Sequence, residues 1–321
     1  MSCRRPLAWL GIVCLLTAAS CGGQGGPLPS ASPSASPTPF AANASCGGCP
    51  AFPCTRECLP ALAEGGPALR PYSQGACPRL EDGWNLGFGF NQRDFILRVP
   101  TATRGPYGLW FLWHGFGGTA QAFDYFLSAR FDADGYILVI PDGQSRYSLE
   151  WGMDLRGGDD DLRFFDDVVA CVNQQFPIDR RRVHATGYSA GGVFSAYLMG
   201  YRSDTLASFG AWSTGETDTK GRRIVPAPAR PVPGLLYHGG RGDKPDWAGR
   251  KGTLALAAHM AENGALAIVC DHGGGHVVPE PFEGTLRDMW AFLLAHPFGP
   301  TAAWATGGLG GRLPDYCSIV G

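Results

Sequence analysis

The feature that most restricts the fold of this chain is a regular alternation of apolar and helical segments between about residues 82 and 298. The apolar segments, such as Leu109–Trp113, are continuously hydrophobic and lack the alternation of a strand with one face in water. The intervening segments, such as 161–176, carry apolar residues at helical spacing. Strands without polar alternation, separated by helices, predict a mostly parallel sheet with helices on both faces, an α/β fold.

This pattern predicts one main domain over 82–298 and a C-terminal tail over 299–321. We expect strands at 109–113, 136–140, 182–186, 207–212, 234–237 and 265–270, and helices at 119–130, 161–176, 193–199, 249–262 and 284–295.

One of the expected strand-to-helix turns has the pattern G-x-S-x-G within the segment Gly187–Gly192. A turn this tight needs glycine at its flanks, because a side chain there would meet the crossing backbone. The turn lifts the Ser189 hydroxyl above the sheet and brings backbone N–H groups to a helix start, where negative charge is favoured. The pattern therefore predicts a nucleophilic serine. Since the chain contains 47 glycines, a glycine-rich turn with an idle serine is the alternative.

Polar residues also follow three of the expected strands, in the segments His114–Gly118, His238–Asp243 and Asp271–His276. Active groups of such sheets gather at the carboxyl ends of the strands. A hydroxyl needs an imidazole to take its proton, and a carboxylate to orient that imidazole. We therefore predict Ser189 as nucleophile, His276 as base and Asp243 as the orienting acid, with His272 and Asp246 as the competing residues.

The turn His114–Gly118 predicts half of an oxyanion hole. Its Phe116 N–H and the N–H of Ala190 are the expected donors to a developing negative oxygen. Possible substrate contacts are His114, Tyr188 and Trp151. The aromatic rings could stack on a ligand or serve as packing, and His114 could instead make structural hydrogen bonds.

Five segments together resemble the polyhydroxybutyrate depolymerase and feruloyl or acetylxylan esterase family of α/β-hydrolases: His114–Gly118, Pro141–Gly143, Gly187–Gly192, His238-Gly239 with a following aspartate, and Gly273–His276. The resemblance covers about residues 80 to 297. It implies an α/β-hydrolase fold and an exported serine esterase with the triad Ser189, Asp243 and His276. It implies no cofactor, and a substrate that is a polyester or an ester carried by plant polysaccharide.

The chain departs from this family at one site position. Three residues, Gly240 to Gly242, separate the His238-Gly239 pair from Asp243, where the family usually has two. Two other functions stay open besides the esterase, namely a peptidase of the same fold and a surface-binding protein with an inactive site, because a fold does not fix a function.

The N-terminus reads as an export signal over 1–20, with two arginines, a short apolar run and small residues. The small residues directly before Cys21 resemble a bacterial lipoprotein cleavage site, which implies lipidation of Cys21 and anchoring to a membrane. Ordinary secretion is the alternative. The segment 21–45 is rich in Gly, Pro and Ser and is typical of a flexible linker.

Eleven cysteines suit an oxidising compartment. Three of them lie within residues 1–21, and an even number remains: Cys46, Cys49, Cys54, Cys58, Cys77, Cys171, Cys270 and Cys317. We predict disulfides that staple a Cys-rich extension, 46–81, to the main domain, with a metal site at Cys46–Cys58 as the alternative. The net charge of −2 and the lack of long basic runs predict no nucleic-acid partner.

Overall fold

The computed structural model describes residues 66–101, 105–131, 135–147, 149–153, 160–299, 304–305 and 308–320. These residues form one sheet with the strand order β1-β2-β4-β3-β5-β6-β7-β8-β9. The strands are β1 (Gly83–Phe88), β2 (Arg93–Arg98), β3 (Tyr107–Trp113), β4 (Tyr136–Pro141), β5 (Ile178–Tyr188), β6 (Ser208–Trp212), β7 (Gly234–His238), β8 (Ala267–Asp271) and β9 (Cys317–Val320). The helices are α1 (Ala120–Phe131), α2 (Asp160–Gln175), α3 (Ala190–Tyr201), α4 (Arg250–Glu262) and α5 (Phe282–Ala295).

The centre of the sheet is parallel and its edges are antiparallel. Strands β4, β3, β5, β6, β7 and β8 pair in parallel. At one edge β1 and β2 add antiparallel pairs, and at the other edge β9 pairs antiparallel with β8. The α/β-hydrolase architecture with a mostly parallel sheet is confirmed. All strands and helices expected from the sequence are present, but β1, β2 and β9 were not predicted.

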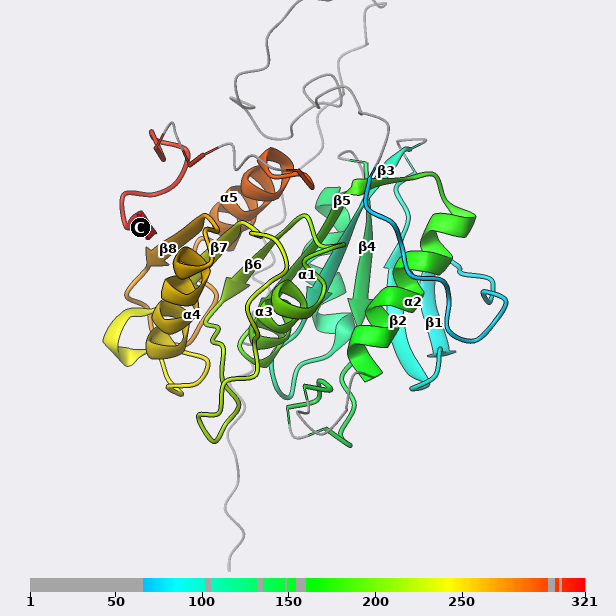
Figure 1. Cartoon of the computed structure of the whole chain (residues 1–321), viewed down its shortest axis with the longest axis horizontal. Helices are drawn as coiled ribbons and strands as arrows, with labels where there is room; N and C mark the ends of the chain where they lie inside the picture. The colour runs from blue at the N-terminus through cyan, green and yellow to red at the C-terminus, as the bar shows by residue number, and fades with distance from the viewer. Residues whose placement is uncertain are drawn as a thin grey trace, which may run out of the picture. The chain divides into compact units, whose positions relative to one another are not determined.

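The helices cover both faces of the sheet, as expected (Figure 1). One hydrophobic core contains residues of α2, α3 and α4, and a second contains residues of α1 and α5. In β3, Leu109, Phe111 and Trp113 face the first core, whereas Trp110 and Leu112 face the second. All five are fully buried, which explains the continuous apolar run in the sequence. Because full burial of one large apolar side chain contributes about 1.5–3 kcal/mol, this strand is a major source of stability.

The described part of the N-terminal extension, residues 66–81, is joined to α2. A disulfide links Cys77 to Cys171, and the carboxylate of Asp167 accepts hydrogen bonds from the N–H and the hydroxyl of Ser73, each at 2.7 Å. The Gln175 side chain accepts from Leu80 N–H and donates to Pro78 O. The contacts advance along α2 as the chain advances, so this extension is stapled to the main domain as predicted.

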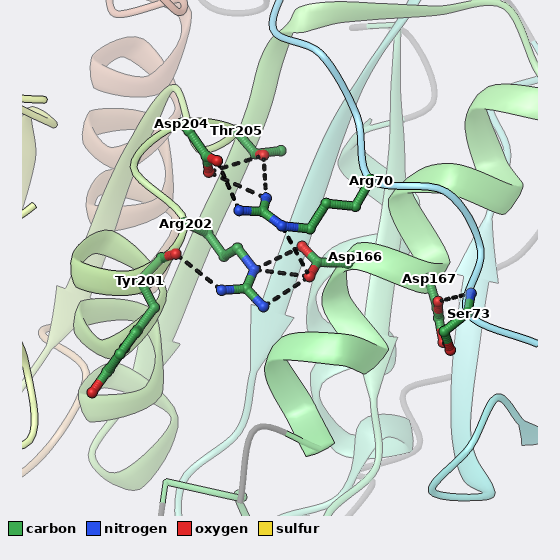
Figure 2. Close-up of polar contacts among 8 residues, drawn as sticks. All are labelled: Arg70, Ser73, Asp166, Asp167, Tyr201, Arg202, Asp204 and Thr205. Carbon is green, nitrogen blue, oxygen red and sulfur yellow. Dashed lines mark hydrogen bonds and ion pairs between the residues drawn. The ribbon is translucent and has the colours of Figure 1, made fainter. Parts of the chain in front are cut away.

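A cluster of charged side chains continues this attachment (Figure 2). Arg202 forms hydrogen bonds of 2.8 and 2.9 Å with the buried carboxylate of Asp166, and Arg70 approaches the same carboxylate at 3.7 Å. Arg70 also donates to Asp204 at 2.7 Å and to Thr205 at 3.3 Å. The cluster thus connects the extension with α2 and with the segment that follows α3.

The C-terminal tail contributes β9, and the disulfide Cys270–Cys317 joins β9 to its neighbour β8. Among the residues listed above as described, no helix has the length and hydrophobicity needed to cross a bilayer. The predicted signal, the lipidation position Cys21, the linker and the Cys46–Cys58 cluster lie outside the described residues.

Candidate active site

Ser189 occupies the turn between β5 and α3. Its backbone has φ +53° and ψ −116°, a conformation that residues with a side chain rarely adopt. The Ser189 N–H donates to the Trp212 carbonyl at 2.9 Å, and the Ser189 carbonyl accepts from Val193 N–H at 2.9 Å. The strained residue is therefore held from both sides. Strain of this kind, of order 1–3 kcal/mol, persists only where surrounding structure enforces it and clusters at active sites.

The glycines of this turn are required by the space around them. A Cβ atom on Gly187 would lie 2.2 Å from the Gly191 carbonyl oxygen. A Cβ atom on Gly191 would lie 2.1 Å from the Trp113 carbonyl oxygen and 2.5 Å from that of His114. All of these neighbours are backbone atoms, which cannot turn aside as a flexible side chain does. The close approach brings the start of α3 against the end of β3.

Three polar side chains from distant segments form a continuous line. The Ser189 Oγ lies 2.9 Å from His276 Nε2. The Nδ1 of the same imidazole lies 2.6 Å from Asp243 Oδ1. With the proton on Nδ1, His276 donates to Asp243 and accepts the hydroxyl proton of Ser189. This arrangement can take a proton from a serine hydroxyl and hold the resulting imidazolium beside a carboxylate.

The environment of Asp243 keeps its carboxylate charged. Its side chain is almost fully buried, at 1 % exposed. Burial alone raises the pKa of such a carboxyl, but hydrogen bonds from His276, the Gly239 N–H and the Ser213 hydroxyl outweigh it. The pKa of Asp243 is therefore below its ordinary value. The donors from Gly239 and Ser213 both reach Oδ2, each at 2.9 Å.

The two competing residues lie elsewhere. Asp246 is exposed and forms ion pairs with Lys244 and Lys251, which lower its pKa. The Nδ1 of His272 accepts from the N–H of Gly274 at 3.3 Å, two residues along its own loop. The structure thus brings His276 and Asp243 to Ser189, and neither His272 nor Asp246.

The two predicted oxyanion donors come from different segments: Ala190 follows Ser189 in the chain, and Phe116 belongs to the turn after β3. Ala190 is the first residue of α3, and Phe116 lies in the turn after β3, which contacts the elbow through Gly191. Within the described part of the chain, neither N–H has a protein hydrogen-bond partner. The next N–H in the turn, from Gly117, donates to Glu150 Oε2 at 2.9 Å. Glu150 therefore fixes the turn after β3, and the Phe116 N–H can still donate to an oxyanion.

The structure corrects two of the three possible substrate contacts. His114 is fully buried, with Nδ1 2.8 Å from the Gly115 carbonyl oxygen and Nε2 accepting from Gly143 N–H at 2.9 Å. Burial also lowers the pKa of His114, which favours the neutral ring. Trp151 is 2 % exposed, stacks on Phe194 and donates to the His114 carbonyl at 3.0 Å. Neither side chain has surface to offer a substrate, so His114 makes structural hydrogen bonds and Trp151 is a packing residue.

Tyr188 lies in the site and makes a contact that the sequence did not predict. Its hydroxyl donates to the His276 carbonyl oxygen at 2.7 Å, and its ring lies 5.3 Å from the imidazole. Burial, with a smaller contribution from Asp243, raises the pKa of Tyr188, so the hydroxyl stays protonated and able to donate. Tyr188 therefore fixes the backbone of the residue that faces Ser189.

Sequence reasoning missed two residues of this site, Ser213 and Glu150. Ser213 directly follows β6, so the rule that polar groups gather at strand ends could have selected it. No comparable signal marks Glu150, because its position depends on a loop whose conformation the sequence pattern does not encode.

No family model matches the sequence. Among curated proteins, the chain is 29% identical over 165 residues to feruloyl esterase D of Neurospora crassa, a match that covers 46% of this chain and 54% of the relative. It is 27% identical over 114 residues to a bifunctional acetylxylan esterase/xylanase of Neocallimastix patriciarum, covering 35% of this chain and 15% of that protein. The chain therefore spans about half the length of the first relative and much less of the second.

Solved structures share the fold. A structure described as native sOPH has a TM-score of 0.59 at 19% identity, covering 78% of this chain and 96% of that chain. A ferulic acid esterase has a TM-score of 0.50 at 18% identity, covering 63% and 92% respectively. The chain has the α/β-hydrolase fold and is similar in sequence to a feruloyl esterase and to an acetylxylan esterase/xylanase. In this fold, the line from Ser189 to Asp243 lies at the carboxyl ends of the parallel strands, where reactive groups gather.

Proposed function

We propose that the chain is a serine carboxylic-ester hydrolase that works through an acyl-enzyme. The observation that supports this most strongly is the line of two hydrogen bonds, 2.9 Å from Ser189 to His276 and 2.6 Å from His276 to Asp243. The strained backbone of Ser189 is a second support, because such strain lowers the stability of the fold and is found mainly at active sites.

In the proposed mechanism, His276 Nε2 takes the hydroxyl proton as Ser189 Oγ attacks the ester carbonyl carbon. The carbonyl oxygen becomes an anion and accepts hydrogen bonds from the N–H groups of Phe116 and Ala190. His276 then gives its proton to the departing alcohol, and an acyl group stays on Ser189. A water molecule repeats the sequence, with its proton passing to His276, and releases the carboxylic acid. Asp243 stays ionised throughout and stabilises the imidazolium. The reaction needs no cofactor.

The first test compares hydrolysis of short p-nitrophenyl esters by the wild-type protein and by Ser189→Ala. Removing the nucleophile of another serine hydrolase costs on the order of 10⁶ in kcat, so near-complete loss is expected. Ser195→Ala is the matched control, since this buried serine of α3 donates only to the Gly191 carbonyl within its own helix, at 3.0 Å. Retention of most activity by Ser189→Ala would contradict the proposal.

Two other outcomes are distinguished by simple probes. A fluorophosphonate labels only an activated serine, so an unlabelled folded protein indicates a surface-binding protein with an inactive site. Comparison of amide and ester turnover identifies a peptidase of the same fold.

For the natural substrate, the resemblance and the two curated relatives support feruloyl or acetyl esters of plant polysaccharide, and the resemblance also supports polyhydroxyalkanoate polyester. The Phe116 side chain, 65% exposed beside the proposed oxyanion donor, provides apolar surface for any of these acyl groups. Feruloylated oligosaccharides, acetylated xylan and short-chain polyhydroxybutyrate, assayed side by side, would identify the class.

We further propose that the protein is exported and anchored by a lipid on Cys21, with residues 21–45 as the spacer to the catalytic domain. The support is the basic, then apolar, then small-residue pattern of residues 1–21. We expect the expressed wild-type protein to partition into the detergent phase and Cys21→Ala to stay in the aqueous phase. Equal partition of the two proteins would contradict the proposed lipid anchor.

A further inference from the structure

We propose that Ser213 is a positioning residue of the active site, whose hydroxyl holds the Asp243 carboxylate so that Oδ1 faces His276. The inference rests on the proposed function, because it assigns a task within the same site. It concerns β6, a strand that carries none of the three reactive groups.

The end of β6 is fixed to the segments on both sides of it. The Trp212 carbonyl accepts the N–H of the nucleophile Ser189 at 2.9 Å. The next N–H, from Ser213, donates to the carbonyl of Tyr237 in β7 at 2.8 Å. Since β7 leads into the turn that carries Asp243, a side chain at position 213 is held in register with both the nucleophile and the acid.

The hydroxyl of Ser213 reaches the far oxygen of the carboxylate. Its Oγ donates to Asp243 Oδ2 at 2.9 Å, and the side chain is fully buried. The Gly239 N–H donates to the same oxygen at 2.9 Å. With Oδ2 held by two donors, the carboxylate cannot rotate without breaking both bonds, and Oδ1 stays directed at His276, 2.6 Å away. Reactive groups need this kind of fixed support to keep productive geometry.

The backbone of Ser213 is unusual in the same way as that of Ser189. Its φ is +54°, in the left-handed region that residues other than glycine rarely adopt, and that of Ser189 is +53°. Two serines at the ends of neighbouring strands thus share a positive φ, and each directs its hydroxyl to a partner in the site. An ordinary extended residue at the end of β6 would continue along the strand rather than turn toward Asp243.

This arrangement predicts two kinetic consequences of losing the hydroxyl. The carboxylate becomes less well oriented for the imidazolium that forms in the transition state, so kcat falls while KM is little changed. A carboxylate that is free to turn also stabilises the imidazolium of His276 differently, so the acid limb of the kcat/KM profile moves relative to that of the wild type.

The test measures kcat, KM and the pH profile for p-nitrophenyl acetate with Ser213→Ala and Ser213→Gly. A hydrogen bond to a charged group predicts a fall in kcat of about 10- to 100-fold in both variants. Glycine accepts the left-handed backbone without strain, so Ser213→Gly tests the hydroxyl even where alanine perturbs folding. The matched control is Ser208→Ala, which removes an equally buried hydroxyl at the start of β6, the strand that Ser213 directly follows. That hydroxyl lies 2.9 Å from His184 Nδ1.

Wild-type kcat and an unmoved acid limb in both Ser213 variants would overturn the inference. An equal loss of kcat in Ser208→Ala would also overturn it, because the effect would then belong to any buried hydroxyl of β6. These failures differ from failure of the proposed function, in which Ser189→Ala itself stays active.

Discussion

At the scale of single residues, Gly191 decides how closely the elbow approaches the oxyanion turn. Its α-carbon faces the carbonyl oxygens of Trp113 and His114, and a Cβ atom would lie 2.1 and 2.5 Å from them. Both oxygens belong to the backbone at the end of β3, just before Phe116. A methyl group here must move α3 away from that turn, and the two proposed oxyanion donors lie one on each side of the gap.

We therefore expect Gly191→Ala to lower kcat by about 10²-fold or more, since each oxyanion donor is worth roughly 10²–10³. Overpacking should also cost about 1–3 kcal/mol of stability, measured by urea unfolding. The control is Gly284→Ala in α5, where a new Cβ atom lies 3.5 Å from Pro281, an ordinary contact. That variant should keep full activity and unfold no more easily, because alanine favours a helix. Wild-type activity in Gly191→Ala would show that the close contact has no catalytic importance.

At the scale of elements, a buried and an exposed carboxylate contribute unequally to the charged cluster that connects the N-terminal extension, α2 and the segment after α3. The Asp166 side chain is 8% exposed and forms ion pairs with Arg202 and Arg70, whereas the Asp204 side chain is 55% exposed and forms an ion pair with Arg70. Figure 2 shows these contacts. Burial raises the pKa of Asp166, although Arg202 and Arg70 oppose this. The two carboxylates thus share Arg70 as a partner, but Asp166 is buried and pairs with Arg202 as well.

This difference predicts unequal effects of removing them. Asp166→Ala leaves the guanidinium of Arg202 largely buried without its partner, so it should lower the free energy of unfolding by about 3 kcal/mol or more. Asp204→Ala breaks a solvent-exposed pair, whose typical value is about 1 kcal/mol or less. Urea unfolding of both variants at neutral pH, with wild type as reference, gives the comparison. Equal losses would mean that burial does not control this attachment.

At the scale of the whole molecule, the sequence predicts the parallel centre of the sheet better than its edges. The strands β3, β4, β6, β7 and β8 are buried on both faces along almost all of their length, so their apolar runs are nearly continuous and easily recognised. Strand β1 exposes Trp84 and Leu86, and β9 has only four residues, so neither gives a clear pattern. Edge strands of this kind are recruited by pairing with a neighbour rather than by their own composition.

The same contrast applies to the candidate site. Residue types at strand ends predicted which serine, histidine and carboxylate meet, because parallel strands bring their ends together. The supporting contacts could not be predicted, since they depend on backbone conformation at single residues. The left-handed φ of Ser213 and of Glu150 directs one hydroxyl to Asp243 and one carboxylate to Gly117. No periodicity in the sequence reports such a turn.

The stability of the whole molecule should depend on pH through Asp288 of α5. This carboxyl is 8% exposed, and burial raises its pKa from 3.8 to about 6, with Arg287 offsetting only part of the effect. The folded protein therefore binds this proton more tightly than the unfolded chain does. A group of this kind adds stability below its unfolded pKa, and that stability is lost as the pH rises from about 4 through about 6.

Asp288→Asn places a neutral side chain of the same shape at this position and removes the dependence. At pH 4 wild type and variant should be equally stable, because Asp288 is then mostly protonated in the folded protein. At pH 7 the variant should be more stable by on the order of 2–3 kcal/mol, since one pKa unit corresponds to about 1.4 kcal/mol.

Asp246→Asn is the control of opposite sign. Lys244 lowers the pKa of that exposed carboxyl. The ionised Asp246 therefore adds a small amount of folding stability above about pH 4, which is lost in acid. Urea unfolding at several pH values decides the matter, and a constant difference between Asp288→Asn and wild type from pH 4 to pH 7 would show that Asp288 does not carry a buried proton.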